Sequence, residues 1–360
     1  MRILASPAFS NSAANPYNAL LYQSLQALDI TVDEYSHKRA LTGHYDIAHF
    51  HWPDGYVNTP NLFKAWQRAI LLTSILMLLK LKGTRIVWTV HNIFPHDAHH
   101  PKLSGNFMHW FVAQCAGLIF MTSQSQAAFK EHYRTREDVT SIVIPHGHYR
   151  SSYSASIPPG EAKKWLGLEP KDKVLLFFGM VKPYKNVDGL IEAFEQASLP
   201  DYVLVIAGNP GTGELAERLA DLCRPHPRIV PRLLFIPEHD VHRYFSAADI
   251  TVLPYSNILN SGALLLSLSF NVPVIAPSIG AMKDLQEALG SAWIHNYPAD
   301  FNHNVLQSAV THLEQQSRPR ECPLSAYDWQ NLAASTRLFY QSVITGAPPE
   351  SAHKAANQTS

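Results

Sequence analysis

Short apolar runs alternate with longer stretches of mixed polarity through the first 150 residues. Each run is only a few residues long, as buried strands are, and the stretches between the runs are long enough for helices. Strands that alternate with helices form parallel sheets, so this pattern predicts an α/β domain. The predicted strands are Arg2–Leu4, Ile47–His51, Arg85–Thr89, Leu118–Thr122 and Ser141–Pro145.

A Ser- and Pro-containing break at residues 151–160 separates this half from a second half with the same alternation. We therefore expect one domain over residues 1–150 and another over residues 151–327. A helix at 328–345 begins with an Asp cap and is expected to pack back towards the first domain. The small, polar residues 346–360 are expected to be disordered. The predicted strands of the second half are Val174–Phe178, Val203–Ala207, Leu233–Phe235, Ile250–Leu253 and Val274–Ala276.

The composition excludes several classes of protein. The 360 residues carry 29 basic and 29 acidic side chains, so no overall field would attract nucleic acid, which we do not expect as a partner. Cys115, Cys223 and Cys322 are too few and too scattered for a disulfide framework or a metal cluster, which fits a reducing compartment. The first residues lack the pattern of a secretory signal. We therefore expect a cytoplasmic protein.

One long apolar run, Ala69–Leu79, is shorter than the roughly 20 residues that a membrane-spanning helix needs. We expect either a buried helix or a helix that lies in an anionic membrane surface, since basic residues flank the run on both sides. The sequence leaves both alternatives open. The flanking basic residues are Lys64, Arg68, Lys80, Lys82 and Arg85.

Three loops that follow predicted strands of the first half are rich in histidine. They are His49–Asp54, His91–Asp97 and His146–Tyr149. The loops at the carboxyl ends of parallel strands carry the ligand-binding groups of α/β domains. Imidazoles and carboxylates can accept a proton from a hydroxyl group, so these loops are predicted to form a catalytic wall. A single histidine is more often structural, and some of these are expected to position their neighbours.

Two loops of the second half have the features of an anion site. In Phe177–Asn186 a glycine turn and two lysines precede a helix, and Tyr255–Ala263 places small residues at the start of another. Backbone amides at a helix N-terminus and nearby ammonium groups together bind phosphates. The alternatives are a plain strand–loop–helix with surface lysines and a plain N-cap at Asn260. Together the loops predict a diphosphate site.

No Asp-x-Asp element or Cys/His metal spacing accompanies these loops. We therefore expect neither a metal nor another cofactor, and lysines and helix dipoles are predicted to balance the charge of the leaving group.

These segments occur in an order that resembles the GT-B glycosyltransferases, and most closely the bacterial exopolysaccharide β-mannosyltransferases of the xanthan type. The resemblance extends over about residues 1 to 345, which makes it far more specific than a single glycine-rich loop. The matching segments are Asn15–Tyr17, His49–Pro53, His91–Asn92, Pro95–Asp97, His146–Arg150, Gly179 with Lys182–Lys185, Gly208–Pro210, Leu253–Tyr255 and Asn260–Gly262.

The resemblance implies a GT-B fold, in which two Rossmann-like domains face each other across a cleft. The first domain would bind the acceptor and the second the nucleotide sugar. It implies transfer of mannose from GDP-mannose to a polyprenyl-diphosphate-linked oligosaccharide in exopolysaccharide biosynthesis, at the inner face of the bacterial plasma membrane. The retaining GT-B enzymes have a Glu pair around the helix that here spans Asn260–Asn271, and this helix contains no acid. We therefore expect inversion of the anomeric configuration.

The resemblance and the loops together predict the site residues. Asp97 is the first choice for the general base and Asp54 the alternative, with His51, His91 and His148 assisting. The predicted donor-binding residues are Gly179, Lys182, Lys185, Asn209, Phe235, Pro237, Tyr255, Asn260, Ser261 and Gly262, and the predicted acceptor-binding residues are Asn15, Tyr17, Trp52, His96 and Tyr149.

Three other functions stay open on the sequence alone. They are a retaining hexosyltransferase that uses another nucleotide sugar, a nucleotide-sugar epimerase or hydrolase, and a non-catalytic glycan-binding subunit.

Overall fold

The computed structural model describes residues 1–12, 15–93, 98–257, 262–298 and 300–347. The chain divides into two compact units, and each contains one six-stranded parallel sheet with helices, so the predicted α/β class is confirmed. Unit 1 contains the chain up to Gly147 and again from Tyr327, and unit 2 contains His148 to Ala326. Most of the tail that we expect to be disordered, from residue 348 onward, lies outside the described residues.

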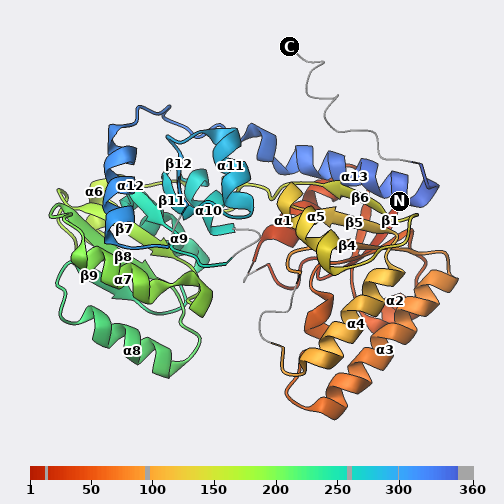
Figure 1. The fold of residues 1–360 in the computed structure, drawn as a ribbon. Coiled ribbons are helices and arrows are strands. Elements are labelled where there is room, and N and C mark those ends of the chain that lie inside the picture. The colour runs from red at the N-terminus through yellow and green to blue at the C-terminus, as the bar shows by residue number, and fades with distance from the viewer. Residues whose placement is uncertain (13–14, 94–97, 258–261, 299, 348–360) are drawn as a thin grey trace. The chain divides into compact units, whose positions relative to one another are not determined.

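The sheet of unit 1 has the strand order β2-β1-β3-β4-β5-β6 (Figure 1). All neighbouring strands are parallel, so every strand ends at the same edge of the sheet. The elements of unit 1 are β1 Arg2–Ser6, α1 Tyr17–Gln26, β2 Thr31–Glu34, α2 His37–Thr42, β3 Ile47–Phe50, η1 Pro53–Tyr56, α3 Leu62–Leu81, β4 Arg85–Thr89, α4 Pro101–Gln114, β5 Gly117–Phe120, α5 Ser123–His132, β6 Thr140–Val143 and α13 Trp329–Thr345.

The sheet of unit 2 has the order β12-β11-β10-β7-β8-β9, again with parallel neighbours. Its elements are α6 Pro159–Leu166, β7 Lys173–Phe178, η2 Pro183–Lys185, α7 Val187–Gln196, β8 Tyr202–Ala207, α8 Gly213–Cys223, β9 Ile229–Arg232, α9 Glu238–Ala247, β10 Ile250–Val252, α10 Gly262–Ser269, β11 Val274–Pro277, α11 Ala281–Leu289, β12 Ile294–Tyr297, α12 His303–Gln315 and, at its end, η3 Ser325–Tyr327.

The sequence prediction fails at three strands, and all three are edge strands of a sheet. It misses β2 and β12, and it places a strand at Leu233–Phe235, although β9 ends at Arg232. An edge strand is less buried than a central one and needs fewer apolar residues. It also tolerates proline, as β9 does at Pro231. Leu233–Phe235 instead belongs to the loop at the carboxyl end of β9.

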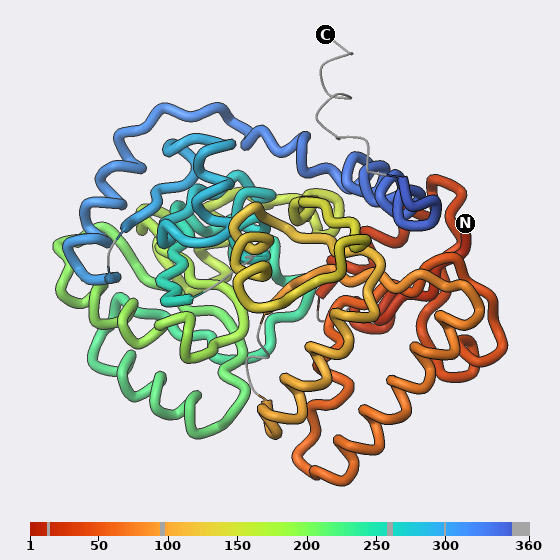
Figure 2. The backbone as a smooth tube through the Cα atoms, turned by 45° about the vertical axis from the view of Figure 1, so that its right-hand side comes forward, coloured from red at the N-terminus to blue at the C-terminus, as the bar shows by residue number. Residues whose placement is uncertain are grey.

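Helix α13 comes from the far end of the sequence and packs against α1 of unit 1 (Figures 1 and 2). Its side chains Trp329, Phe339 and Tyr340 are buried in the core that β1, β3 and β4 also line. At Gly147 an added Cβ would lie 2.4 Å from Cε2 of Trp329. Glycine at this position therefore lets the indole ring pack directly on the backbone after β6.

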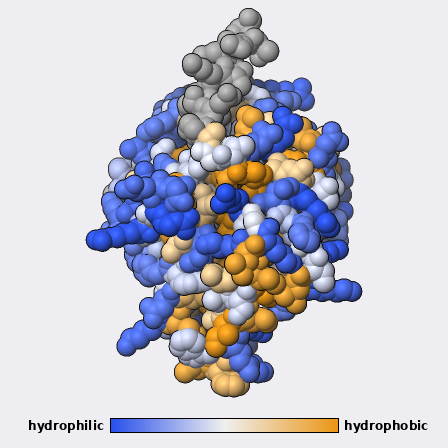
Figure 3. All heavy atoms as spheres, turned by 90° about the vertical axis from the view of Figure 1, so that its right-hand side faces the viewer, coloured by the Kyte–Doolittle hydropathy of each residue, from blue (hydrophilic) through white to orange (hydrophobic). Residues whose placement is uncertain are grey.

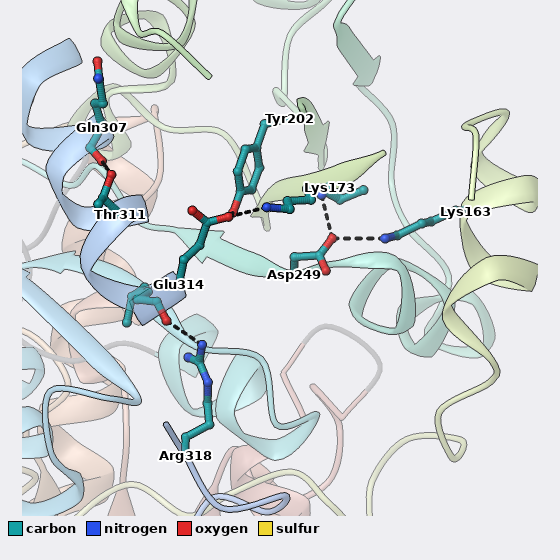
Figure 4. Close-up of polar contacts among 10 residues, drawn as sticks. Lys163, Lys173, Tyr202, Asp249, Gln307, Thr311, Glu314 and Arg318 are labelled. Carbon is teal, nitrogen blue, oxygen red and sulfur yellow. Dashed lines mark hydrogen bonds and ion pairs between the residues drawn. The ribbon is translucent and has the colours of Figure 1, made fainter. Parts of the chain in front are cut away.

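Polar groups fix the opposite edge of the unit 2 sheet, where β7 and β8 begin (Figure 4). Glu314 of α12 accepts hydrogen bonds from Lys173 and from the hydroxyl of Tyr202, 2.9 Å away. Asp249 lies 3.2 Å from the ammonium group of Lys163 and accepts a bond from the backbone of β7. These contacts lie at the amino ends of the strands, so they hold the sheet together away from the ligand-binding edge.

Helix α3 is long and apolar enough to cross a membrane by length and composition, and only 33% of its most apolar window is buried. The predicted run Ala69–Leu79 is therefore part of a 20-residue helix. Figure 3 shows hydrophobic residues gathered in the lower part of the view, where α3 lies. Seven of its large apolar side chains are exposed: Leu62, Phe63, Trp66, Ile70, Leu71, Met77 and Leu81.

Candidate functional site

The predicted donor residues of unit 2 gather at the carboxyl ends of four neighbouring strands, β10, β7, β8 and β9. Asn260 and Ser261 lie outside the described residues, so the predicted amide of Ser261 stays a prediction. The others follow these strands in order: Gly179, Lys182 and Lys185 after β7, Asn209 after β8, Phe235 and Pro237 after β9, and Tyr255 and Gly262 after β10.

Two glycines bring the loops after β7 and β8 into direct backbone contact. Gly179 has a φ of 124° and Gly208 a φ of 155°. A Cβ on Gly208 would lie 2.0 Å from the carbonyl oxygen of Gly179, so no other residue fits there. Gly208 is buried and Gly179 is partly exposed, so the close approach of the two loops leaves the backbone of Gly179 accessible to a ligand at the carboxyl ends of the strands.

Lys185 is the cation nearest to these glycines. Its Nζ lies 3.3 Å from the position of a Cβ on Gly179 and 5.5 Å from the ring centroid of Tyr255. Burial, together with repulsion from Lys182, lowers the pKa of Lys185 to about 8. Lys185 has no ion pair with the described residues. A partly buried cation without a counterion would bind an anion such as a diphosphate.

The other donor candidates have different local roles. The side-chain oxygen of Asn209 accepts a hydrogen bond from the backbone of Gly211 at 2.8 Å, so Asn209 shapes the turn after β8. Pro237 is the N-cap residue of α9. The side chain of Phe235 is 62% exposed at the carboxyl end of β9 and could stack on a flat ring.

Unit 1 has an anion-binding loop of its own, and a carboxylate of the chain occupies it. The backbone N–H groups of Ala8, Phe9 and Ser10, in the loop after β1, all donate to the side chain of Glu34 over 2.6 to 3.2 Å. Successive N–H groups of this kind bind phosphates in many α/β proteins. In unit 1 the place for an anion is filled by Glu34, at the end of β2.

A chain of hydrogen-bonded aromatic side chains lies at the corresponding edge of the unit 1 sheet. We call His49, His51 and His91, together with Tyr22 and Tyr340, the histidine cluster. The hydroxyl of Tyr22 lies 2.9 Å from Nδ1 of His49 and 2.6 Å from Nε2 of His51, and Nδ1 of His51 lies 3.0 Å from Nε2 of His91. His49 also contacts Tyr340 at 2.6 Å and Thr89 at 2.8 Å.

Burial keeps these imidazoles neutral. It lowers the pKa of His49 to about 3 and that of nearby His146 to about 4, and it lowers the pKa values of His51 and His91 well below the ordinary value. Neighbouring imidazoles lower the pKa of His51 and His91 further. At neutral pH each ring therefore carries a single proton, on one of its two nitrogens.

The position of that proton is coupled along the chain. If Tyr22 donates to His51, then His51 donates from Nδ1 to His91, and His91 carries its proton on Nδ1. If Tyr22 accepts instead, His91 donates from Nε2 and its Nδ1 is an acceptor. The hydroxyl of Tyr22 thus decides whether His91 presents a donor or a base at Nδ1.

Aromatic rings surround this cluster. Trp52 stacks on His91 with ring centroids 4.3 Å apart, and Tyr17 meets His91 edge-on at 5.1 Å. Tyr17 also contacts Trp329 of α13 at 5.3 Å. The side-chain oxygen of Asn15 accepts a hydrogen bond from the backbone of Tyr17, so Asn15 fixes the start of α1.

Within unit 1 the structure brings His51, His91, Tyr17 and Trp52 together. His148 and Tyr149 are buried residues of unit 2, where Tyr149 donates from its backbone to Ser269, and their predicted roles stay predictions. Asp54 lies in η1 and is partly exposed. His96 and Asp97 lie outside the described residues, so their roles stay predictions.

Sequence reasoning did not assign roles to His49, Tyr22, Tyr340 and Trp329. One signal was available, since His49 and His51 are two residues apart on a strand and so point to the same face of the sheet. No comparable signal marks Tyr22 or the two residues of α13, because their partners are far away in the sequence. Among the described residues no group of three or more His, Cys, Asp or Glu side chains could hold a metal ion.

Comparison with known proteins gives the same picture. Residues 160–317 match the family described as glycosyl transferases group 1. Over 346 residues, 95% of the chain and 91% of the relative, the chain is 28% identical to a GDP-mannose:glycolipid 4-beta-D-mannosyltransferase of Xanthomonas campestris pv. campestris. It is 24% identical over 314 residues, 83% of the chain and 66% of the relative, to a D-inositol 3-phosphate glycosyltransferase of Geodermatophilus obscurus.

Solved structures share the fold. A sucrose-phosphate synthase from Thermosynechococcus elongatus superposes with a TM-score of 0.68 at 15% identity, over 96% of this chain and 99% of that one. The Anabaena protein HepE, solved with UDP and glucose, gives a TM-score of 0.63 at 15% identity, over 96% and 97%. These likenesses confirm the GT-B fold and, with the relatives, the predicted resemblance.

The pKa of Lys185 predicts how diphosphate binding depends on pH. Binding needs the charged ammonium, so the Kd for a bound nucleoside diphosphate should rise about tenfold between pH 7 and pH 9 as a group with a pKa of about 8 loses its proton. Calorimetric titration with GDP, UDP and ADP would measure this. A Lys185→Arg variant keeps its charge at both pH values and should show a flat profile. A rise of the same size in that variant would contradict the assignment.

The histidine cluster predicts a coupled change of tautomers. In Tyr22→Phe the ring of His51 loses its partner at Nε2, so the proton should redistribute over His51 and His91. Nitrogen-15 NMR of the histidine rings would detect this, and thermal unfolding should show a loss of about 1–3 kcal/mol for the unsatisfied nitrogen.

Tyr340→Phe removes a hydroxyl that contacts both His49 and Tyr22 and leaves both contacts of His51 in place, so its effect on His51 should be the smaller one. Unchanged His51 and His91 signals in Tyr22→Phe would contradict the coupling.

Proposed function

Because this chain is a glycosyltransferase with the GT-B fold, we propose that it transfers mannose from GDP-mannose to a glycolipid, with inversion at the anomeric carbon. The observation that carries the proposal is the similarity over nearly the whole chain to relatives described as GDP-mannose:glycolipid 4-beta-D-mannosyltransferases. The unpaired cation Lys185 beside the glycine loops supports it independently, since a sugar nucleotide brings a diphosphate.

The donor binds to unit 2 in this proposal. Lys182, Lys185 and the backbone around Gly179 hold the diphosphate, and the N-terminus of α10 at Gly262, with Ser261 before it, adds amides. The nucleobase lies against Phe235. Negative charge develops on the diphosphate as the sugar leaves, so groups already oriented towards it stabilise the transition state without a metal.

The acceptor hydroxyl loses its proton to Asp97, or to Asp54 as the alternative. Its oxygen then attacks the anomeric carbon as the bond to the diphosphate breaks, and GDP leaves with that electron pair. One base and one in-line attack give inversion. His51, His91 and His148 orient the base and the acceptor, and Trp52, Tyr17, Asn15, His96 and Tyr149 shape the acceptor site.

The acceptor in this proposal is a polyprenyl-diphosphate-linked oligosaccharide of exopolysaccharide biosynthesis, at the cytoplasmic face of the membrane. The surface of α3 supports contact with a membrane. Phe63, Trp66 and Ile70, with Met77 and Leu81, fall within about 60° of one another on a wheel of about 100° per residue. This exposed stripe lies opposite the buried positions Ala65, Leu72 and Leu76 and has Lys80 beside it, in the arrangement of an interfacial helix.

The transfer reaction is tested with purified protein, a lipid-linked oligosaccharide acceptor and GDP-mannose, UDP-glucose or ADP-glucose, each with and without EDTA. We expect mannose transfer only from GDP-mannose, at the same rate with EDTA, and a β-linked product by NMR. Lys185→Ala should lower kcat by at least tenfold in a folded protein.

An α-linked product would discard inversion and keep the transferase. Transfer from UDP-glucose alone would discard the donor. Retained GDP-mannose binding in Asp97→Asn with activity lost, while Asp54→Asn stays active, would identify the base, and the opposite pattern would exchange the two roles.

The membrane proposal predicts a loss of vesicle binding when charge enters the stripe. The double substitution Phe63→Glu and Ile70→Glu removes two exposed apolar side chains worth about 1.5–3 kcal/mol each when buried. Co-sedimentation with anionic vesicles should therefore fall more than tenfold. Leu222→Glu, at an exposed leucine of α8 in unit 2, is the matched control and should bind as before. Equal binding by all three proteins would exclude α3 as the contact.

A further inference from the structure

Unit 1 contains a pocket of about 320 Å³ on the flank of α3. Arg68, Leu71 and Leu72 of α3 form one side of it, and Trp52 and Tyr56 line it from the segment after β3, with His37 from the start of α2. This volume is at the lower end of the range for small-molecule sites. The pocket is large enough for a phosphate group and a short piece of chain.

Hydrogen-bond donors outnumber acceptors among the polar side chains that line this pocket. The guanidinium of Arg68 and the indole N–H of Trp52 can only donate. The imidazole of His37 has one donor and one acceptor when it is neutral, and the hydroxyl of Tyr56 bonds to Ser6. The side chains of Arg68, Trp52 and His37 have no hydrogen bond or ion pair with the described residues, and no carboxylate is among the described residues that line the pocket. An excess of donors around a hollow favours an anion, and an arginine among them favours a phosphate.

The other lining residues are apolar and continue onto the exposed surface of the helix. Leu71 lines the pocket and is 44% exposed, and Ile70 beside it is 61% exposed in the apolar stripe. On the helical wheel Lys64 and Leu71 lie between the stripe and the buried face, and Arg68 lies at the near edge of the buried face, about 140° from Phe63. An anionic head in the pocket would therefore have its apolar chain along α3.

The pocket and the histidine cluster share one side chain. Trp52 lines the pocket and stacks on His91 at 4.3 Å between ring centroids. A molecule whose phosphate lies against Arg68 can thus continue past Trp52 towards the imidazoles of His51 and His91.

From these contacts we propose that the pocket binds the phosphate end of a membrane-anchored lipid, with the lipid chain on the stripe of α3. The proposal rests on the proposed function, because the acceptor there is a glycolipid carried on a diphosphate. It assigns Arg68, His37 and Trp52 to the lipid carrier rather than to the sugar that reacts. A free phosphate is not the proposed occupant, because apolar side chains line much of the pocket and the exposed Leu71 continues from it along α3.

The test uses the full chain and farnesyl diphosphate, a short isoprenoid diphosphate, with saturating GDP present to occupy the donor site. We expect Arg68→Gln to raise the Kd for farnesyl diphosphate at least tenfold. Lys64→Gln, one turn away on the same flank but outside the pocket, should change it less than twofold. Inorganic pyrophosphate and farnesol should each bind the wild-type protein at least tenfold more weakly than farnesyl diphosphate.

Three outcomes would overturn the proposal. Equal Kd values for Arg68→Gln and Lys64→Gln would mean that the pocket does not hold the diphosphate. Pyrophosphate binding as tight as farnesyl diphosphate would mean a site for free phosphate only. Binding lost in Lys185→Ala but kept in Arg68→Gln would place the probe in the donor site and would also overturn it.

The experiments distinguish a failure of the lipid site from a failure of the proposed function. If wild-type protein transfers no mannose but binds farnesyl diphosphate through Arg68, the lipid site stands and the donor or the reaction is wrong. If it transfers mannose and Arg68→Gln raises neither the Kd for farnesyl diphosphate nor the KM for the lipid acceptor, the reaction stands and the lipid site is wrong.

Discussion

In a parallel sheet the carboxyl ends of all strands lie on the same side, and this constraint decides where chemistry can occur in both units. Helices cover the faces, so the loops at the carboxyl ends are where backbone amides and polar side chains of several strands can meet. In unit 2 this edge collects Gly179, Gly208 and Lys185, and in unit 1 it collects the histidine cluster. The amino ends carry ion pairs such as Lys163–Asp249, which stabilise the sheet and leave the other edge free for ligands.

The hydrophobic pattern predicts the central strands well because they are buried on both faces. Edge strands escape it, since β2 includes Asp33 and Glu34 and β9 contains Pro231, and neither reads as a buried run. The fold class follows from the alternation of strands and helices, and the glycosyltransferase activity from the family resemblance of the loop segments. The burial and pairing of an edge strand depend on its neighbours in the assembled sheet, and these neighbours are distant in the sequence.

The candidate site was predictable where a motif is local and unpredictable where it depends on distant partners. Gly179, Lys182 and Lys185 lie within one loop, and together with the loop Tyr255–Ala263 they predict an anion site. The coupling of His51 to His91 depends on Tyr22 of α1, and the setting of His49 depends on Tyr340, which is 291 positions away. Asn15 and Asn209 have motif positions but bond to their own loops, so a motif residue can support a site without contacting its ligand.

Glu34 gives unit 1 a property that distinguishes it from unit 2, although both units contain a similar parallel sheet. The loop after β1 is the usual place for a nucleotide phosphate, and Glu34 fills it with a carboxylate that the chain itself supplies. Because Glu34 is fixed on β2, its carboxylate stays next to these N–H groups, and a nucleotide phosphate could bind there only by displacing it and leaving it unpaired. In the proposed division of roles, the loop after β1 therefore excludes a second nucleotide from unit 1 without any steric barrier.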